Sequence, residues 1–122
     1  MAKDHPKLVK LRKLIARLPE TSEKLSHGSP TFWGGKKTFA TFHLDHHGDG
    51  RVAVWVKSTL DAQDMLVQAA PEVFFVPPYV GPSGWVGVNL AGKPDWKVVE
   101  ETLVDGYRMV APKRALKQLD GE

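Results

Sequence analysis

The sequence predicts one α+β domain, a two-layer sandwich in which an antiparallel sheet carries the N- and C-terminal helices on one face. Three observations predict it. Alternating apolar residues over 37–44, 51–57 and 85–90 are typical of half-buried strands. Helical periodicity over residues 5–18 and 95–111 is typical of amphipathic helices near the chain ends. The length of 122 residues suits a single domain with one core, so we assign residues 1–122 to it.

The composition excludes several classes of protein. Hydrophobic residues make up 42% and charged residues 25%, which is ordinary globular usage rather than disorder. The chain has no cysteine, which removes disulfides, thiolate nucleophiles and cysteine-based metal sites. No apolar segment reaches the roughly 20 residues that a membrane span needs, and the charged N-terminus is unlike a secretory signal. We therefore expect a cytoplasmic protein with no membrane partner.

A helix is predicted near the N-terminus, from about residue 3 or 5 to residue 18, where Pro19 stops it. Its apolar arc carries Leu8, Leu11, Leu14, Ile15 and Leu18. Its basic arc carries Lys3, Lys10, Lys13 and Arg17. Residues 1–17 hold six basic side chains and one acidic side chain, so the positive charge of the chain is concentrated here. Such a stripe is either a solvated helix face or a surface that attracts a polyanion.

Turns and strands are expected over residues 19–57. Residues 19–36 are rich in turn formers, with a short strand over 31–33. The strand over 37–44 should place Ala40, Phe42 and Leu44 on one face and Phe39, Thr41 and His43 on the other. Asp49-Gly50 indicates a hairpin. The next strand should turn Val52, Val54 and Val56 toward the helices, and Arg51, Trp55 and Lys57 away from them.

The rest of the chain predicts a second helix, two strands and a last helix. The second helix runs from the cap at Ser58 or Thr59 to about residue 70, with a buried stripe of Ala62, Met65, Leu66 and Ala69. A short strand over 73–76, a stiff Pro-rich loop over 77–84 and a strand over 85–90 follow. The last helix begins after Asp95 and reaches about residue 111. Its buried stripe is Trp96, Val99, Leu103, Gly106, Tyr107 and Val110, and Gly106 suggests a close approach to another element. A basic tail starts beyond Pro112.

The sequence has no recognisable catalytic or cofactor-binding motif, so we expect no catalytic residue, no metal and no cofactor. None of the five histidines follows a nucleophile motif, and Gly34-Gly35-Lys36-Lys37 lacks the spacing of a phosphate-binding loop. One cluster has metal-ligating residue types, namely His43, Asp45, His46, His47 and Asp49. It lies on one hairpin tip without the supporting groups that metal sites use, so a polar loop is the simpler interpretation.

Six ordered blocks resemble the MmcQ/YjbR family over roughly residues 5–116. They are Leu18-Pro19-Glu20-Thr21, Ser26-His27-Gly28-Ser29-Pro30-Thr31-Phe32, Phe74-Phe75-Val76-Pro77-Pro78-Tyr79-Val80-Gly81, Gly84-Trp85-Val86-Gly87-Val88, Asp95-Trp96, and Gly106-Tyr107-Arg108 with Val110-Ala111-Pro112-Lys113-Arg114. The resemblance implies a CyaY-like (frataxin-like) fold and DNA binding, and it supplies no catalytic residues. Iron binding in CyaY-like proteins uses an acidic first helix, whereas this one is basic, so iron is not carried over.

The leading functional hypothesis is a non-enzymatic protein that binds DNA or another nucleic acid with low sequence specificity. The face of the sheet turned away from the helices would interleave cations, for phosphates, with aromatic rings, for bases. The residues expected to contribute are Lys36, Lys37, Arg51, Trp55, Lys57, Trp85, Lys113 and Arg114. The same rings could instead pack under the second helix or the Pro-rich loop, or form the interface of a weak dimer. Two rivals stay open: a protein-interaction module that uses this aromatic face, and a small-ligand or enzyme site near His27, Tyr79 and Trp85.

Overall fold

The computed structural model describes residues 5–121, and these form an antiparallel sheet of six strands in the order β1-β2-β3-β4-β6-β5. The strands are β1 Thr21–Ser26, β2 Ser29–Gly34, β3 Lys37–Leu44, β4 Val52–Val56, β5 Phe74–Phe75 and β6 Val86–Asn89. The helices are α1 Pro6–Ile15, α2 Leu60–Ala69, α3 Trp96–Arg108 and α4 Lys113–Asp120. Short 3₁₀ turns, η1 His46–Gly48 and η2 Gly81–Ser83, lie in the loops.

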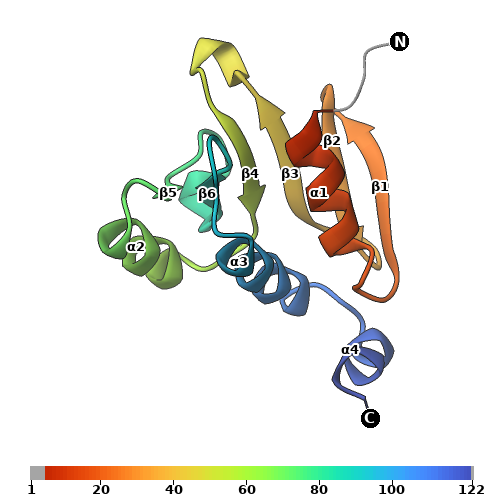
Figure 1. The fold of residues 1–122 in the computed structure, drawn as a ribbon. Helices are drawn as coiled ribbons and strands as arrows, with labels where there is room; N and C mark the ends of the chain where they lie inside the picture. The colour runs from red at the N-terminus through yellow and green to blue at the C-terminus, as the bar shows by residue number, and fades with distance from the viewer. Residues whose placement is uncertain (1–4, 122) are drawn as a thin grey trace.

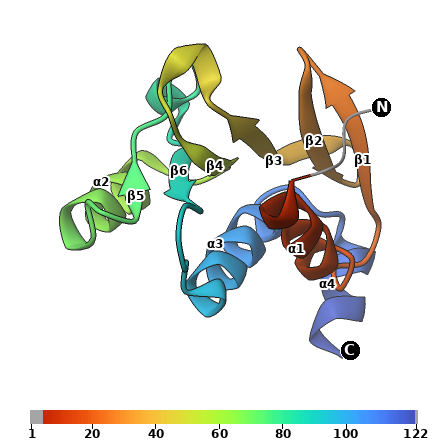
Figure 2. The same ribbon diagram turned by 45° about the horizontal axis from the view of Figure 1, so that its top comes forward.

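The predicted α+β sandwich is confirmed. Figures 1 and 2 show α1, α3 and α4 together on one side of the sheet, whereas α2 stands apart from them beside β5. The main core lies between the sheet and α1 with α3, and it includes Phe42, Val54 and Val88 from the strands. A second, smaller apolar cluster lies on the other face of the sheet around Ala53, Trp55 and Trp85. The sheet is therefore covered on both faces, by helices on one and by loops on the other.

The first helix forms where its periodicity and its end signals agree. His5 caps it, because the His5 ring accepts a hydrogen bond of 3.0 Å from the backbone N–H of Lys7, and Pro6 occupies the first helical turn. The predicted apolar arc is buried at Leu8, Leu11 and Leu14. Lys3, which we placed on the basic arc, lies outside the described residues. The rest of that arc faces outward, with Arg17 bonded to Glu100 at 3.1 Å.

Gly106 brings α3 against the sheet, as the sequence suggested. A Cβ at this position would lie 2.6 Å from Cγ1 of Val56 and 2.8 Å from the carbonyl oxygen of Lys57. Tyr107, the next residue, is fully buried and packs edge-on against Phe39. Its hydroxyl donates to the carbonyl of Pro19 at 2.5 Å, and burial raises the pKa of this phenol. These contacts join α3 to β3 and to the connection between α1 and β1.

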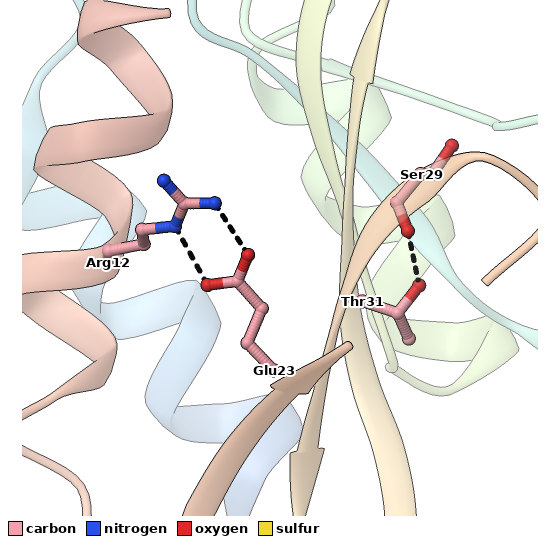
Figure 3. Close-up of polar contacts among 4 residues, drawn as sticks. All are labelled: Arg12, Glu23, Ser29 and Thr31. Carbon is pink, nitrogen blue, oxygen red and sulfur yellow. Dashed lines mark hydrogen bonds and ion pairs between the residues drawn. The ribbon is translucent and has the colours of Figure 1, made fainter. Parts of the chain in front are cut away.

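Strand β1 was missed by the sequence interpretation, which treated residues 19–30 as turns. Its four central residues are exposed, so no alternation of buried apolar side chains marks it. It pairs with β2 through a two-residue turn at His27 and Gly28, whose φ angles are +51° and +80°. These two left-handed residues match the twist of a tight hairpin. The Arg12–Glu23 ion pair, with N···O distances of 2.6 and 2.7 Å, then holds the edge strand beside α1 (Figure 3).

Phe39 lies on the helix-covered face, contrary to the prediction from strict alternation. Phe32 pairs with Ala40 and Trp33 pairs with Thr38, so Phe39 has no partner on β2. This bulge turns Phe39 into the main core beside Ala40, where it is fully buried. Beyond the bulge the alternation holds, with Phe42 in the core and His43 on the opposite face. Leu44 at the strand end is half exposed, although we expected it on the core face.

Two helical predictions also need correction. On α2 only Gln63 is buried, Leu66 and Val67 are partly buried, and the expected Met65 is 70% exposed. Gln63 can be buried because its side-chain amide donates to the carbonyls of Gly81 at 2.8 Å and Trp85 at 2.6 Å.

The expected last helix to residue 111 ends at Arg108, and the expected basic tail is the helix α4. Ala115 and the partly buried Leu116 and Leu119 dock α4 on the main core.

Candidate functional site

A pocket of about 620 Å³ lies on the face of the sheet opposite α1 and α3. We call it the far-face pocket. The sheet forms its base, and the hairpin tip at η1, the Pro-rich loop and the β1–β2 turn surround it. Its lining residues are Ser26, His27, Ser29, Thr31, Thr38, Thr41, His43, His46, His47, Trp55, Tyr79, Val80 and Trp85. The pocket therefore joins His27, Tyr79 and Trp85, the three residues of the small-ligand alternative.

Trp55 and Trp85 lie on the far face, as predicted, but they do not form an open platform. Their side chains are only 5% and 7% exposed, because Phe75 and Val80 pack against them. His43 also covers Trp55, with ring centroids 3.5 Å apart and an interplanar angle of 23°. Of the alternatives that the sequence left open, the structure has the rings packed under the Pro-rich loop, through Val80, rather than exposed as a platform. Bases or a protein partner cannot stack freely on Trp55 in this arrangement.

His43 is fixed at the base of the pocket by two hydroxyls. Its Nε2 lies 2.8 Å from Oγ1 of Thr41, and its Nδ1 lies 3.3 Å from Oγ of Ser29. Thr31 in turn donates to the carbonyl of Ser29 at 3.0 Å, which holds that end of β2 in place (Figure 3). The alternation of β3 already placed Thr41 and His43 on one face. The sequence analysis missed Ser29 and Thr31 of β2, because only the folded sheet brings this strand beside His43.

The imidazole of His43 is neutral at neutral pH. Burial, with a smaller contribution from the nearby His46, lowers its pKa to about 4, and the charge of Asp49 opposes this shift only in part. A neutral imidazole carries one donor and one acceptor nitrogen. His43 can therefore hydrogen-bond both neighbouring hydroxyls, or a bound molecule, without carrying charge.

The rim of the pocket is a group of rings from two loops. His46 lies edge-on to Trp55 at 4.8 Å and to His47 at 4.2 Å between ring centroids. Nε2 of His47 lies 3.2 Å from the hydroxyl of Tyr79, which is 73% exposed. This contact ties the β3–β4 tip to the Pro-rich loop, so the two segments close the same side of the pocket.

Backbone strain gathers at this pocket. Within residues 5–121, the non-glycine residues with positive φ are Glu20, His27, Asp45, His47 and Tyr79. Three of them, His27, His47 and Tyr79, line the far-face pocket, at φ angles of +51°, +49° and +66°. Each such residue costs roughly 1–3 kcal/mol, and strained residues concentrate at binding and catalytic sites. Three residues with left-handed backbone, each in a separate loop, therefore lie around this one pocket.

The carboxylates near the hairpin tip stabilise the loop itself. Asp45 accepts from the backbone N–H of Gly50 at 2.7 Å, and Asp49 accepts from that of Arg51 at 2.8 Å. Across the described part of the chain, no group of three or more His, Asp or Glu side chains is arranged to hold a metal ion. The arrangement of His43, His46 and His47 is one of packed rings, with 5.1 Å between the centroids of the first two.

The predicted basic residues fall into two places, neither of them in the far-face pocket. Lys36, Lys37 and Arg114 line a small cleft with Pro112, and Lys113 adjoins it at the start of α4. Lys57 lies toward the same end of the sheet, since its N–H bonds to the carbonyl of Phe39. Arg51 is at the opposite end of β4, with its guanidinium 3.9 Å above the ring of Phe75. Arg114 is paired with Glu20 through N···O distances of 2.6 and 2.7 Å.

The fold and this site define a class: an α+β sheet protein with a polar, aromatic-walled pocket on the face that its helices leave open. The chain belongs to the YjbR family, whose model matches residues 16–109. It is similar in fold to the crystal structure of Deinococcus radiodurans protein DR2400, a DUF419-domain protein. That likeness has a TM-score of 0.71 and 22% identity, and it covers 93% of this chain and 87% of that chain. No curated protein sequence matches this chain. No helix within residues 5–121 is both long enough and apolar enough to cross a membrane.

Proposed function

We propose that this protein binds a small molecule in the far-face pocket. One observation carries the proposal: three loop residues with left-handed backbone, His27, His47 and Tyr79, converge on a single pocket of about 620 Å³. Pockets for small molecules span roughly 300–1,000 Å³ and combine apolar walls with a few convergent polar groups. Here the wall is indole and phenol, and the polar groups are hydroxyls and imidazoles.

The proposed role is binding without chemical turnover. The group placed best to act as a base is His43, and its pKa of about 4 makes it a weak base at neutral pH. The hydroxyl of Ser29 lies 3.3 Å from Nδ1 of His43, while Nε2 bonds Thr41. Among the described residues, no carboxylate lines the pocket to orient this imidazole as a catalytic triad would.

Nuclear magnetic resonance of the indole groups tests the proposal. The chain has four tryptophans, of which Trp55 and Trp85 line the pocket and Trp33 and Trp96 do not. In a titration with a fragment library, binding fragments should shift the indole N–H signals of Trp55 and Trp85 and leave the other two in place. A library that shifts none of the four signals, or shifts only those of Trp33 and Trp96, contradicts the proposal.

A pair of variants at Thr38 locates the binding. Thr38 lines the pocket from β3. Thr38→Phe should fill part of the cavity and abolish the fragment shifts. Thr38→Val keeps the shape of threonine, so it should retain most of the binding. Equal binding by both variants would place the fragments elsewhere.

A second candidate function, low-specificity DNA binding, is favoured by the basic corner of Lys36, Lys37, Lys113 and Arg114. Four cations near one cleft can contact successive phosphates, and such binding weakens steeply with salt. The open lysines supply the greater part of this attraction, because Arg114 already pairs with Glu20.

Fluorescence anisotropy with a labelled DNA duplex tests this second function. We expect binding at low salt that is lost on raising the ionic strength. The double variant Lys36→Gln/Lys37→Gln should weaken it about tenfold and flatten its salt dependence. Arg51→Gln, at the other end of β4, is the matched control and should change little. No binding at low salt, or equal losses in both variants, would refute a DNA surface at this corner.

A further inference from the structure

We infer that the ligand of the far-face pocket is a planar aromatic carboxylate. This inference rests on the proposed function and names its ligand class. It follows from three properties of the pocket: the absence of carboxylates from its described lining, its unpartnered hydrogen-bond donors and the position of its aromatic side chains.

The charge of the lining admits an anion. Among the described residues that line the pocket there is no aspartate or glutamate, and four of the chain's five histidines are there. The nearest carboxylates, Asp45 and Asp49, are engaged with backbone N–H groups of their own loop. A bound carboxylate therefore meets imidazoles and hydroxyls and no opposing carboxylate. The described lining also has no lysine or arginine, so a carboxylate would be held by neutral hydrogen-bond donors, whereas an ammonium group would find no carboxylate partner.

Two side chains of the pocket bring hydrogen-bond donors that have no partner among the described residues. The indole N–H groups of Trp55 and Trp85 can only donate, and neither has a hydrogen-bond partner among residues 5–121. Both side chains are more than nine-tenths buried, yet no polar atom of the described side chains is sealed without a partner. Each indole nitrogen therefore keeps some exposed surface, and both tryptophans line the far-face pocket. A carboxylate offers two oxygens with about four acceptor positions.

The aromatic contacts favour a flat molecule. Tyr79 is 73% exposed, and its contact with His47 holds the ring at the rim of the pocket. The rings of His46 and His47 lie beside it, at centroid distances of 5.9 and 6.2 Å. A fused aromatic system can enter between these rings and the sheet, with its acid group directed to the indoles and hydroxyls. Ring contacts of this kind strengthen binding beyond the effect of the area they bury.

Three probes with the same ring system test the inference by isothermal titration calorimetry: 2-naphthoate, 2-naphthamide and 2-naphthylmethylamine. The carboxylate should bind about tenfold more tightly than the amide, and the amine should bind most weakly. Equal or tighter binding of the amide or amine would overturn the inference. So would failure of all three probes while other fragments shift Trp55 and Trp85, and the proposed function would then stand. Failure of every fragment and every probe would overturn both.

Variants of two pocket residues separate the ring contact from the donors. Tyr79→Phe keeps the ring and should bind 2-naphthoate within about threefold of the natural protein. Tyr79→Asn removes the ring, but asparagine tolerates the left-handed backbone at this position, so the loop should persist. It should lose about tenfold in affinity. Trp55→Phe removes one indole donor and should reduce the preference for the carboxylate over the amide. An unchanged preference in Trp55→Phe, with a native-like spectrum, would overturn the role of the donors.

Discussion

At the scale of the residue, His43 shows how position decides the chemistry of a side chain. It stacks on Trp55 at the base of the far-face pocket, and hydroxyls from two strands meet its two nitrogens. Because burial favours the uncharged form, the pKa falls from 6.5 to about 4. The residue is thereby a neutral hydrogen-bonding group rather than a cation at neutral pH.

This shift predicts a loss of stability in acid. As the pH falls from 6.5 to about 4, His43 takes up a proton in the unfolded chain before it does so in the folded one. The unfolded state then binds more protons, so the free energy of unfolding decreases with falling pH. The decrease in the free energy of unfolding reaches about 3 kcal/mol below the pKa of His43 in the folded protein. Above its pKa in the unfolded chain there is no decrease.

Urea unfolding from pH 4 to pH 7 measures the effect. His43→Phe keeps the ring contact with Trp55 but cannot titrate, so its stability should depend less steeply on pH. The other four histidines are common to both proteins, so the difference between the two curves reports on His43 together with its interaction with His46. Parallel stability curves for the two proteins would show that the burial of His43 has no such consequence.

At the scale of the element, small departures from regular periodicity set the packing. The bulge at Phe39 lets β3 place Phe39, Ala40 and Phe42 in one core and still direct His43 to the other face. On the opposing helix, Gly106 provides the gap that receives Val56 and the backbone of Lys57. Helix α3 packs closely on the sheet because β3 has a bulge at Phe39 and α3 has a glycine at position 106.

Gly106→Ala should destabilise the protein although alanine favours a helix by about 1 kcal/mol. The added methyl would meet the Lys57 carbonyl at 2.8 Å, and a backbone atom cannot move aside cheaply. We expect a net loss of about 1–3 kcal/mol, measured by chemical denaturation. Asp105→Ala, at the exposed neighbouring position, is the control and should change stability little. A stabilised Gly106→Ala protein would mean that α3 can move away from the sheet.

At the scale of the whole molecule, the sheet separates the main hydrophobic core on one face from the far-face pocket on the other. Helices α1, α3 and α4 lie on one side of the sheet (Figure 2). They bury the main core there, and the loops on the other face form the far-face pocket. The outermost helix, α4, contributes Ala115 and two partly buried leucines to the core, and it lies beyond the region that the family model matches. The pocket includes no residue of α4.

Removal of residues 112–122 should therefore lower stability without altering the pocket. The lost burial corresponds to about 2 kcal/mol, which a thermal unfolding experiment would register as a lower midpoint. The indole signals of Trp55 and Trp85, and their response to fragments, should stay as in the full chain. Loss of the fragment response in a truncated protein that remains folded would show that the two layers are coupled.

The sequence by itself determined the α+β class, the apolar arc of α1, the buried stripe of α3 with its close approach at Gly106, and the facing of Thr41 and His43. These depend on local periodicity, which the chain carries regardless of its neighbours. The tertiary structure alone decided that β1 exists, that Phe39 bulges into the core, and that Trp55 and Trp85 are covered. An exposed edge strand has no periodic signal, a bulge depends on its partner strand, and burial depends on loops distant in the chain. For the same reason His27, Tyr79 and Trp85 could suggest a site, but only the folded chain brings their separate segments together around the far-face pocket.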